Sequence, residues 1–250
     1  MNIAIFGDSF ANGESDMTHH LAHLGLTQYL MDDGHFVINF SRQGNSNTGT
    51  KQDFSFNIRQ NEHIKWDMAI VFQTEPCRED MGWIDCLRDV GIRKVESVMA
   101  SRFYSQLKEV VEPFSIPIYM VGGTVDILEP KEVEKFGFKC ACQSLVNLCV
   151  NGKHTIEEPV TNFVFPVGIG WKSPDYFFNK ANKIIKGTNA KKHFLKLLEV
   201  GENRYKLMED NPKYFAPEEN LTGKAKNPVD HPNRYAYKKL FNHLKSEGVV

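Results

Sequence analysis

The stretch that most constrains the fold is Met1–Gly13, with the sequence MNIAIFGDSFANG. An apolar run from Ile3 to Phe6 leads directly into Gly-Asp-Ser. A short apolar run that stops at a glycine is typical of a buried parallel strand entering a tight turn. The turn places Ser9 at the carboxyl end of this strand, the edge where open α/β sheets hold ligands and chemistry. Ser9 is therefore a candidate nucleophile.

Further apolar runs predict the rest of a sheet. We expect four more strands, at residues 36–40, 68–72, 116–121 and 163–167. Helical spacing of apolar residues predicts helices between them. We expect one from a cap at Asp16 or Thr18 through Leu21 and Leu24 to Gly34, a short one within 48–65, one from Val95 to Pro113, short pieces in 124–162, and a last one after His231. Strands alternating with helices predict a three-layer α/β sandwich around a parallel sheet.

The whole chain, 1–250, is expected to form one domain. The segment at about 172–226 is rich in Lys, Asn and Glu, and is interpreted as an elaboration of that domain.

Charge and apolar content exclude several classes of function. Lys and Arg number 30 against 31 Asp and Glu, a formal net charge of -1, which argues against a nucleic-acid binder. No apolar run approaches the ~18 residues that span a bilayer, so no membrane association is expected. The first predicted strand begins at residue 2, which leaves no room for a signal peptide. These features favour the cytoplasm and leave a virus particle open as an alternative location.

Polar residues follow the predicted strands at their carboxyl ends. They are Gly7-Asp8-Ser9, Gly44-Asn45, Thr74-Glu75 and Gly122-Gly123, with Asp230-His231-Pro232 before the last helix. In a doubly wound sheet these loops converge on one rim. Serine chemistry needs a base that titrates near neutrality, and His231 is the candidate. It also needs hydrogen-bond donors for an oxyanion, which Gly44 and Asn45 could supply.

At these motifs the sequence resembles the SGNH hydrolases. Gly7-Asp8-Ser9-Phe10 is similar to their GDSL signature, Gly44 to their second block, and Asp230-His231-Pro232-Asn233 to their fifth. The resemblance implies that Ser9 is the nucleophile, His231 the general base, and the N–H groups of Ser9 and Gly44 the oxyanion donors. It implies a five-stranded parallel sheet in flavodoxin-like order. It also implies a serine esterase without a cofactor, acting on a small ester such as an acetyl group on a carbohydrate.

Two blocks depart from the family pattern. The third block of the family ends in Gly-x-Asn-Asp, whereas here the strand runs into Gln73-Thr74-Glu75-Pro76. An ionised Glu75 only accepts hydrogen bonds and would repel an oxyanion, so Gln73, Thr74 or Asn45 would have to donate. The fifth block has Asp three residues before His, whereas Pro228 stands here and Asp230 is the nearest acid. These departures keep an alternative open, a non-catalytic SGNH-like structural or binding protein.

Other features have simpler interpretations. Asp8 and Ser9 could both serve only to cap the following helix. His19 and His23 would form an i,i+4 pair on a helix, but a solvated face is favoured, because no acidic or thiol partner accompanies them. Cys140, Cys142 and Cys149 lack zinc-site spacing, so we expect reduced thiols and no metal. The lysines between 180 and 196 predict a solvated face. The oligomeric state stays open.

Overall fold

The computed structural model describes residues 1–15, 21–74, 92–123, 125–156, 207–208, 210–216 and 231–250. Its main feature is a five-stranded sheet in the order β4-β1-β5-β6-β7. The strands are β1 Asn2–Phe6, β4 Phe36–Asn39, β5 Met68–Gln73, β6 Ile118–Gly122 and β7 Lys139–Cys142. All four pairings are parallel. In chain order the strands lie 2-1-3-4-5, which is the flavodoxin-like order, so the predicted fold class is confirmed.

Alternate residues of the central strands enter two separate cores, one on each face of the sheet. Ile3 and Ile5 belong to the first core, whereas Ala4 and Phe6 belong to the second. Every residue of β5 is buried. A strand buried on both faces carries a continuous apolar run, and this explains the IAIF and MAIVF segments.

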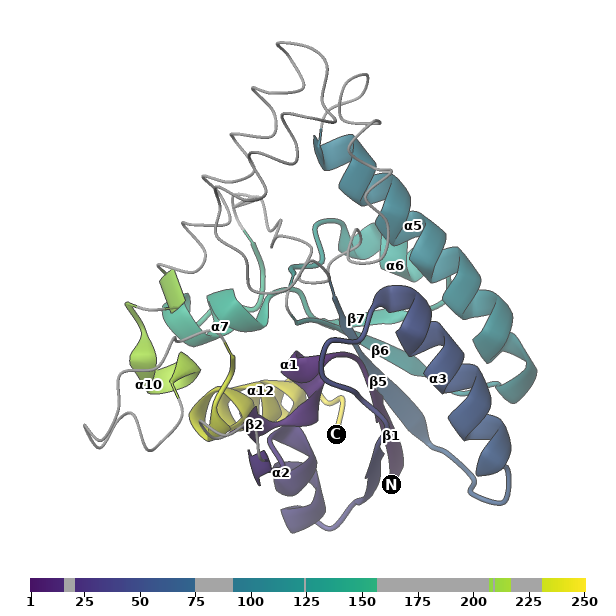
Figure 1. Cartoon of the computed structure of the whole chain (residues 1–250), viewed down its shortest axis with the longest axis horizontal. Helices are drawn as coiled ribbons and strands as arrows, with labels where there is room; N and C mark the ends of the chain where they lie inside the picture. The colour runs from purple at the N-terminus through teal and green to yellow at the C-terminus, as the bar shows by residue number, and fades with distance from the viewer. Residues whose placement is uncertain (16–20, 75–91, 124, 157–206, 209, 217–230) are drawn as a thin grey trace.

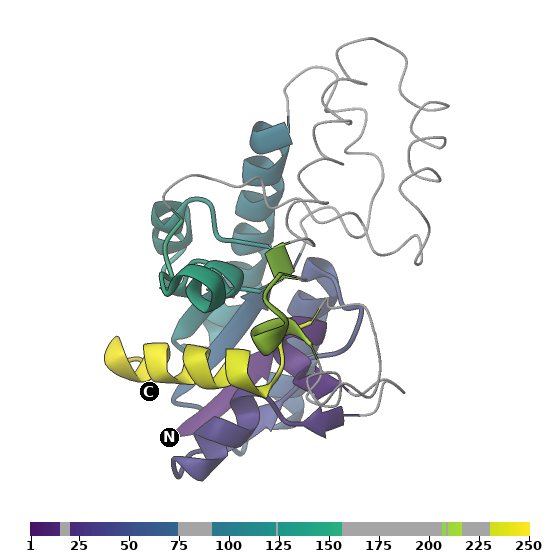
Figure 2. The ribbon, with the colours of Figure 1, turned by 90° about the vertical axis from the view of Figure 1, so that its left-hand side faces the viewer.

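Helices cover both faces of the sheet (Figures 1 and 2). The first core is closed by α1 Ser9–Asn12, α2 Leu26–Asp32, α7 Leu145–Asn151, α10 Pro212–Phe215 and α12 Arg234–Ser246. The second core is closed by α3 Asn47–Gln60, α5 Ile92–Val111 and α6 Pro130–Lys135. A short 3-10 turn, Glu112–Phe114, follows α5 and contains Pro113. The resulting arrangement has three layers, with β1 and β5 in the middle of the sheet.

The segment after β1 differs from the predicted helix. Leu21–His23 forms β3, which pairs antiparallel with β2, Glu14–Ser15. The helix α2 begins only at Leu26, while Asp16 and Thr18 lie outside the described residues. Gly25, with φ +60°, separates β3 from α2, and a Cβ there would lie 2.8 Å from Gly13 Cα and 3.0 Å from the Tyr237 ring. This close approach requires a glycine, and the helical spacing of the leucines could not reveal it.

The fifth strand also differs from the prediction. β7 lies at Lys139–Cys142, within a region for which short helices were predicted, and residues 163–167 are outside the described part of the chain. The sequence KCAC carries few strand-forming residues, so its pairing with β6 determines its structure. Two parts of the expected elaboration are described, and there Met208 and Phe215 are buried in the first core.

The remaining predictions differ only at element ends. β4 stops at Asn39 rather than Phe40, β6 starts at Ile118 rather than Ile116, and α5 starts at Ile92 rather than Val95. No helix in the described ranges has both the length and the apolar character needed to cross a membrane.

Candidate active site

The turn after β1 separates a capping residue from an exposed serine. Gly7 has φ +148°, and a Cβ at this position would lie 2.8 Å from Phe72 Cβ, so only glycine fits. Asp8 is fully buried and caps α1, because its Oδ1 accepts a hydrogen bond from Phe10 N at 2.9 Å. Ser9 is the first residue of α1 and is partly exposed. Capping is thus carried by Asp8, which leaves the Ser9 hydroxyl available for another contact.

That contact is with His231. Ser9 Oγ and His231 Nε2 lie 2.8 Å apart, although 222 positions separate the two residues in the chain. The Phe10 ring flanks the imidazole, with centroids 5.6 Å apart. The structure therefore brings together the two residues that the sequence singled out as candidate nucleophile and base.

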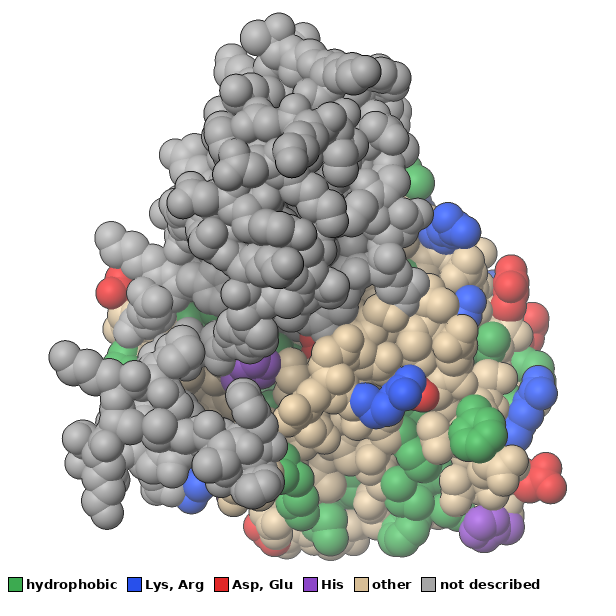
Figure 3. Space-filling view, in the orientation of Figure 1, with side chains coloured by type: hydrophobic (Ala, Val, Ile, Leu, Met, Phe, Trp, Pro, Cys, Tyr) green, Lys and Arg blue, Asp and Glu red, His purple; other side chains and the backbone are tan. Residues whose placement is uncertain are grey.

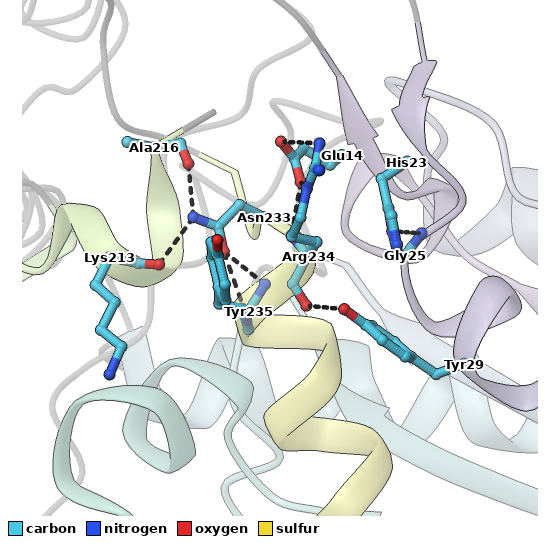
Figure 4. Close-up of polar contacts among 10 residues, drawn as sticks. Glu14, His23, Gly25, Tyr29, Lys213, Ala216, Asn233, Arg234 and Tyr235 are labelled. Carbon is cyan, nitrogen blue, oxygen red and sulfur yellow. Dashed lines mark hydrogen bonds and ion pairs between the residues drawn. The ribbon is translucent and has the colours of Figure 1, made fainter. Parts of the chain in front are cut away.

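Asn233 fixes the turn that carries His231 (Figure 4). Its Oδ1 accepts hydrogen bonds from Tyr235 N at 3.0 Å and Ala236 N at 3.3 Å, which caps α12. Its Nδ2 donates to Lys213 O at 2.9 Å and Ala216 O at 2.6 Å. Since Asn233 is 1% exposed, these bonds form away from water and join the start of α12 to the segment around α10.

A buried ion pair holds the same turn against the β2–β3 hairpin. Glu14 is 2% exposed, and its Oε2 accepts hydrogen bonds from Arg234 N at 2.7 Å and Arg234 Nε at 2.9 Å. Arg234 Nη2 lies 3.3 Å from the other carboxylate oxygen, so the contact is bidentate. Tyr29 Oη donates to Arg234 O at 3.0 Å. The hairpin thus anchors the residues three positions after His231.

Tyr237, on α12, holds α1 through a buried hydrogen bond. Its hydroxyl donates to Phe10 O at 3.0 Å, and the side chain is fully buried. Burial, to which the charge of Asp8 adds, raises the pKa of Tyr237, so the hydroxyl stays protonated and remains a donor. The helix α12 directly follows the turn that carries His231, and through Tyr237 it also contacts the helix that begins with Ser9. It therefore links the two turns.

The Gly44 loop lies beside the same strand end. Gly44 has φ +70°, a conformation that favours glycine. Arg42 N donates to Gly7 O at 3.2 Å. Asn45 Nδ2 lies 3.3 Å from Gly7 O and 2.9 Å from Asp53 Oδ2. Through these contacts the Asn45 side-chain amide holds the Gly44 loop against the turn that carries Ser9. The amide would have to break these hydrogen bonds before it could donate to an oxyanion.

Asn47, which the sequence interpretation missed, holds the residue that follows β5. Thr74 is fully buried, its N–H donates to Asn47 Oδ1 at 3.2 Å, and its carbonyl accepts from Asn47 Nδ2 at 3.1 Å. Gln73 Oε1 accepts from the Tyr104 hydroxyl, and Gln73 Nε2 lies 3.5 Å from Asp126 O. The Gln73 side chain and the Thr74 backbone are therefore engaged in holding the loops together.

Several predicted residues are placed elsewhere or lie outside the description. Glu75 and Asp230 are outside the described residues, as are His19, His20 and the lysines between 180 and 196. His23 lies on β3 rather than on a helix, and its Nδ1 accepts from Gly25 N at 2.9 Å. The described cysteines Cys140, Cys142 and Cys149 are free thiols.

Asn233 and Glu14 both hold the turn that carries His231, but the sequence indicates only the role of Asn233. Asn233 directly precedes the last helix, where asparagine is a preferred cap, so its role could have been inferred. Glu14 pairs with a residue 220 positions away, and nothing in its neighbourhood indicates that partner.

No protein-family model matches the chain, and a search of curated proteins finds no significant relative. Solved structures do resemble it. TesA is 10% identical, with 98% of this chain and 97% of that chain covered and a TM-score of 0.41. The psychrotrophic esterase EstA from Pseudoalteromonas sp. is 14% identical, with 98% and 94% covered and a TM-score of 0.41.

AlinE4, described as an SGNH-hydrolase family esterase, is 17% identical, with 74% of this chain and 97% of that chain covered and a TM-score of 0.39. Likenesses as distant as these do not establish a function.

Proposed function

We propose that the protein is a serine ester hydrolase of the SGNH type, with Ser9 as nucleophile and His231 as general base. The observation that carries the proposal is the 2.8 Å contact between Ser9 Oγ and His231 Nε2 at the carboxyl edge of the sheet. A nucleophile and a base within hydrogen-bond reach are the signature of an activated hydroxyl. A serine that only capped a helix would need no imidazole beside it.

The reaction follows from this geometry. With its proton on Nδ1, His231 accepts the Ser9 hydroxyl proton at Nε2 while Oγ attacks the ester carbonyl carbon. His231 then gives the proton to the departing alcohol, and the acyl group stays on Ser9. In the second half, water attacks the acyl-enzyme, His231 takes the proton of that water, and Oγ recovers a proton as the carboxylic acid leaves.

The backbone N–H groups of Ser9 and Gly44 are the proposed donors for the oxyanion. Ser9 is the first residue of α1, and the N–H groups of a helix's first turn have no partner within that helix. Gly44 has no side chain to shield its backbone, and a Cβ at this position would meet open space. With the side chains of Asn45 and Gln73 and the backbone of Thr74 engaged elsewhere, these two amides are the proposed replacement for the side-chain donor that the third block lacks.

A small uncharged ester, with an acetyl group on a carbohydrate as the preferred example, is the proposed substrate. The described part of the face in Figure 3 carries both acidic and basic side chains, some of them side by side, among other surface atoms. A surface of mixed charge does not concentrate a polyanion, which agrees with the net charge of -1. The proposed partner is therefore a small molecule.

A fluorophosphonate probe tests the proposal directly, because it phosphonylates an activated serine. We expect one equivalent of label on Ser9, located by peptide mass spectrometry, together with turnover of p-nitrophenyl acetate. Ser9→Ala should abolish both, and His231→Ala should reduce both by about 10³-fold or more, as loss of the histidine base does in other serine hydrolases. Ser46→Ala is a matched control, because Ser46 caps α3 and does not contact His231 in any described interaction.

Two results would reject catalysis. One is the absence of labelling and turnover in folded wild-type protein, which would favour the non-catalytic alternative. The other is labelling that persists in Ser9→Ala. If the esterase survives these tests, release of acetate from an acetylated sugar, compared with p-nitrophenyl butyrate hydrolysis, then tests the proposed substrate.

A further inference from the structure

The loop that contains Gly44 is a tight turn, and the form of this turn sets the direction of the Gly44 N–H. Asn45 N donates to Arg42 O at 3.1 Å, which closes a turn over residues 42–45. Gly44 is its third residue and has φ +70°, whereas φ of Gln43, the second residue, is negative. A positive φ at the third residue alone is typical of a type II turn. In the common type I turn the peptide between the second and third residues has the opposite orientation, and its N–H would point to the other side of the turn.

Asp53 holds both ends of this turn. It lies on α3, the helix that follows the loop (Figure 1). Its Oδ2 accepts hydrogen bonds from Arg42 Nε at 2.8 Å and from Asn45 Nδ2 at 2.9 Å, and its side chain is only 14% exposed. Hydrogen bonds to a charged acceptor are roughly twice as strong as those between neutral groups. One carboxylate oxygen therefore ties the first residue of the turn to the fourth, on either side of the peptide that carries the Gly44 N–H.

The start of α3 leaves room for the Asn45 side chain. Gly49 lies in the first turn of α3, and a Cβ there would lie 2.0 Å from Asn45 Oδ1. Glycine weakens a helix relative to alanine, so local helix stability does not explain its use here. The close approach does, because it lets the Asn45 amide lie against α3 and reach Asp53. Two separate features of α3, the glycine and the carboxylate, thus serve the same contact.

We propose that Asp53 is a positioning residue for the oxyanion donor at Gly44, an inference that rests on the proposed ester hydrolysis. By holding Arg42 and Asn45, Asp53 keeps the turn in its type II form and the Gly44 N–H in one direction. A donor that is fixed before the reaction needs no reorganisation when the oxyanion forms. Arg42 also offsets the negative charge of Asp53, which would otherwise oppose the charge that develops on the substrate. Asp53 itself neither touches the substrate nor moves a proton.

Steady-state kinetics of p-nitrophenyl acetate hydrolysis by the full-length protein test the proposal. Asp53→Ala should lower kcat by about 10²-fold, because one whole oxyanion donor contributes ~10²–10³. KM should stay within about twofold, because the oxyanion exists only in the transition state. Asp53→Asn keeps one acceptor oxygen and should lose only about tenfold in kcat. The acid side of the pH profile of kcat/KM should not move in either variant, because it reports protonation of the base His231, which should stay in place.

Two further variants separate positioning from folding. Gly49→Ala leaves Asp53 in place and favours the helix, but its methyl group displaces the Asn45 amide. It should therefore lower kcat by about tenfold while the far-ultraviolet spectrum stays that of the wild type. Asp33→Ala is the matched control, because it removes a surface carboxylate that pairs with Lys245, and it should leave kcat unchanged.

The results that would overturn the proposal differ from those that would reject the esterase. In a wild-type protein that hydrolyses the ester, the proposal fails if kcat of Asp53→Ala stays within about threefold of wild type, if only KM changes, or if the acid side of the pH profile shifts. If Asp53→Ala does not fold, the same criteria apply to Gly49→Ala. A folded wild-type protein that neither hydrolyses esters nor takes the fluorophosphonate label would reject the proposed function and this inference with it.

Discussion

The ion pair between Glu14 and Arg234 should contribute both to the free energy of unfolding and to the position of His231. Arg234→Met removes the guanidinium from a carboxylate that is 2% exposed, whereas Glu14→Gln removes the carboxylate from a guanidinium that is 27% exposed. A buried carboxylate that loses its counter-charge cannot rehydrate, even though the backbone N–H of residue 234 still donates to it, while a partly exposed guanidinium can rehydrate. Arg234→Met should therefore be the more damaging of the two single changes.

The magnitude follows from burial. Breaking a buried pair by removing one partner costs about 3–5 kcal/mol, and we place Glu14→Gln near 3 and Arg234→Met near 5. These are large fractions of the roughly 5–15 kcal/mol that stabilises a typical domain. Because the pair holds the turn three residues from His231, molecules that remain folded should also lose about 10²-fold in kcat, as expected for a misplacement of about 1 Å.

Urea unfolding, followed by circular dichroism, measures both single variants and the double variant. If the two residues stabilise each other, the double variant should lose less free energy of unfolding than the sum of the single losses. Lys245→Met is the control, because Lys245 forms its ion pair with Asp33 at the surface, at 2.8 Å, and its removal should leave the urea midpoint nearly unchanged.

Three results would refute this reasoning. The first is a loss below about 1 kcal/mol in both single variants, which is the size of an exposed pair. The second is strict additivity in the double variant. The third is an unchanged kcat in variants that remain folded, which would show that the pair does not position His231.

Other predictions follow from residues of the same region and of the core. Gly7→Ala should cost about 2–4 kcal/mol in urea unfolding, because the new methyl group overlaps its neighbours at a φ of +148°. Asn233→Ala should cost about 2–4 kcal/mol, against about 1 for Ser46→Ala, because only Asn233 also satisfies two carbonyls; equal losses would contradict this. Burial raises the pKa of Cys140 and Cys149 from 9.0 to about 12. The folded protein thus keeps protons that the unfolded chain releases, so the urea midpoint should fall as the pH rises from about 9 to 12, and Cys149→Ala should flatten that fall.

Four of the five strands could be predicted because they carry strong local signals, whereas the order of the sheet was implied by the family resemblance. The IAIF and MAIVF runs are apolar on both faces and end in polar turns, a pattern that favours strands buried in a parallel sheet. The strand Lys139–Cys142 could not be predicted this way. It lies at the edge of the sheet, and pairing with β6, rather than the preferences of its own residues, makes it a strand.

The same contrast holds for the site. Ser9 and His231 were predicted because each lies in a short motif with a known use, and a motif is a local property. The anchors Glu14 and Asn47 act through partners that only the folded chain brings near. The two interpretations of the GDS turn, cap or nucleophile, proved compatible, because Asp8 does the capping and Ser9 faces the imidazole.

The contact between Ser9 and His231 also has a consequence for synthesis in the cell. His231 follows Ser9 by 222 positions, so the ribosome makes the serine long before the histidine. A ribosome that has completed every strand of the described sheet has still not made the histidine or the helix that holds it. A nascent chain therefore has no paired serine until residue 231 has been made, and a fragment that stops before residue 231 lacks the base while it keeps the sequence of the described sheet. Division of the chain within residues 157–206 would yield two halves, each with one member of the pair, and an esterase signal would then report their association.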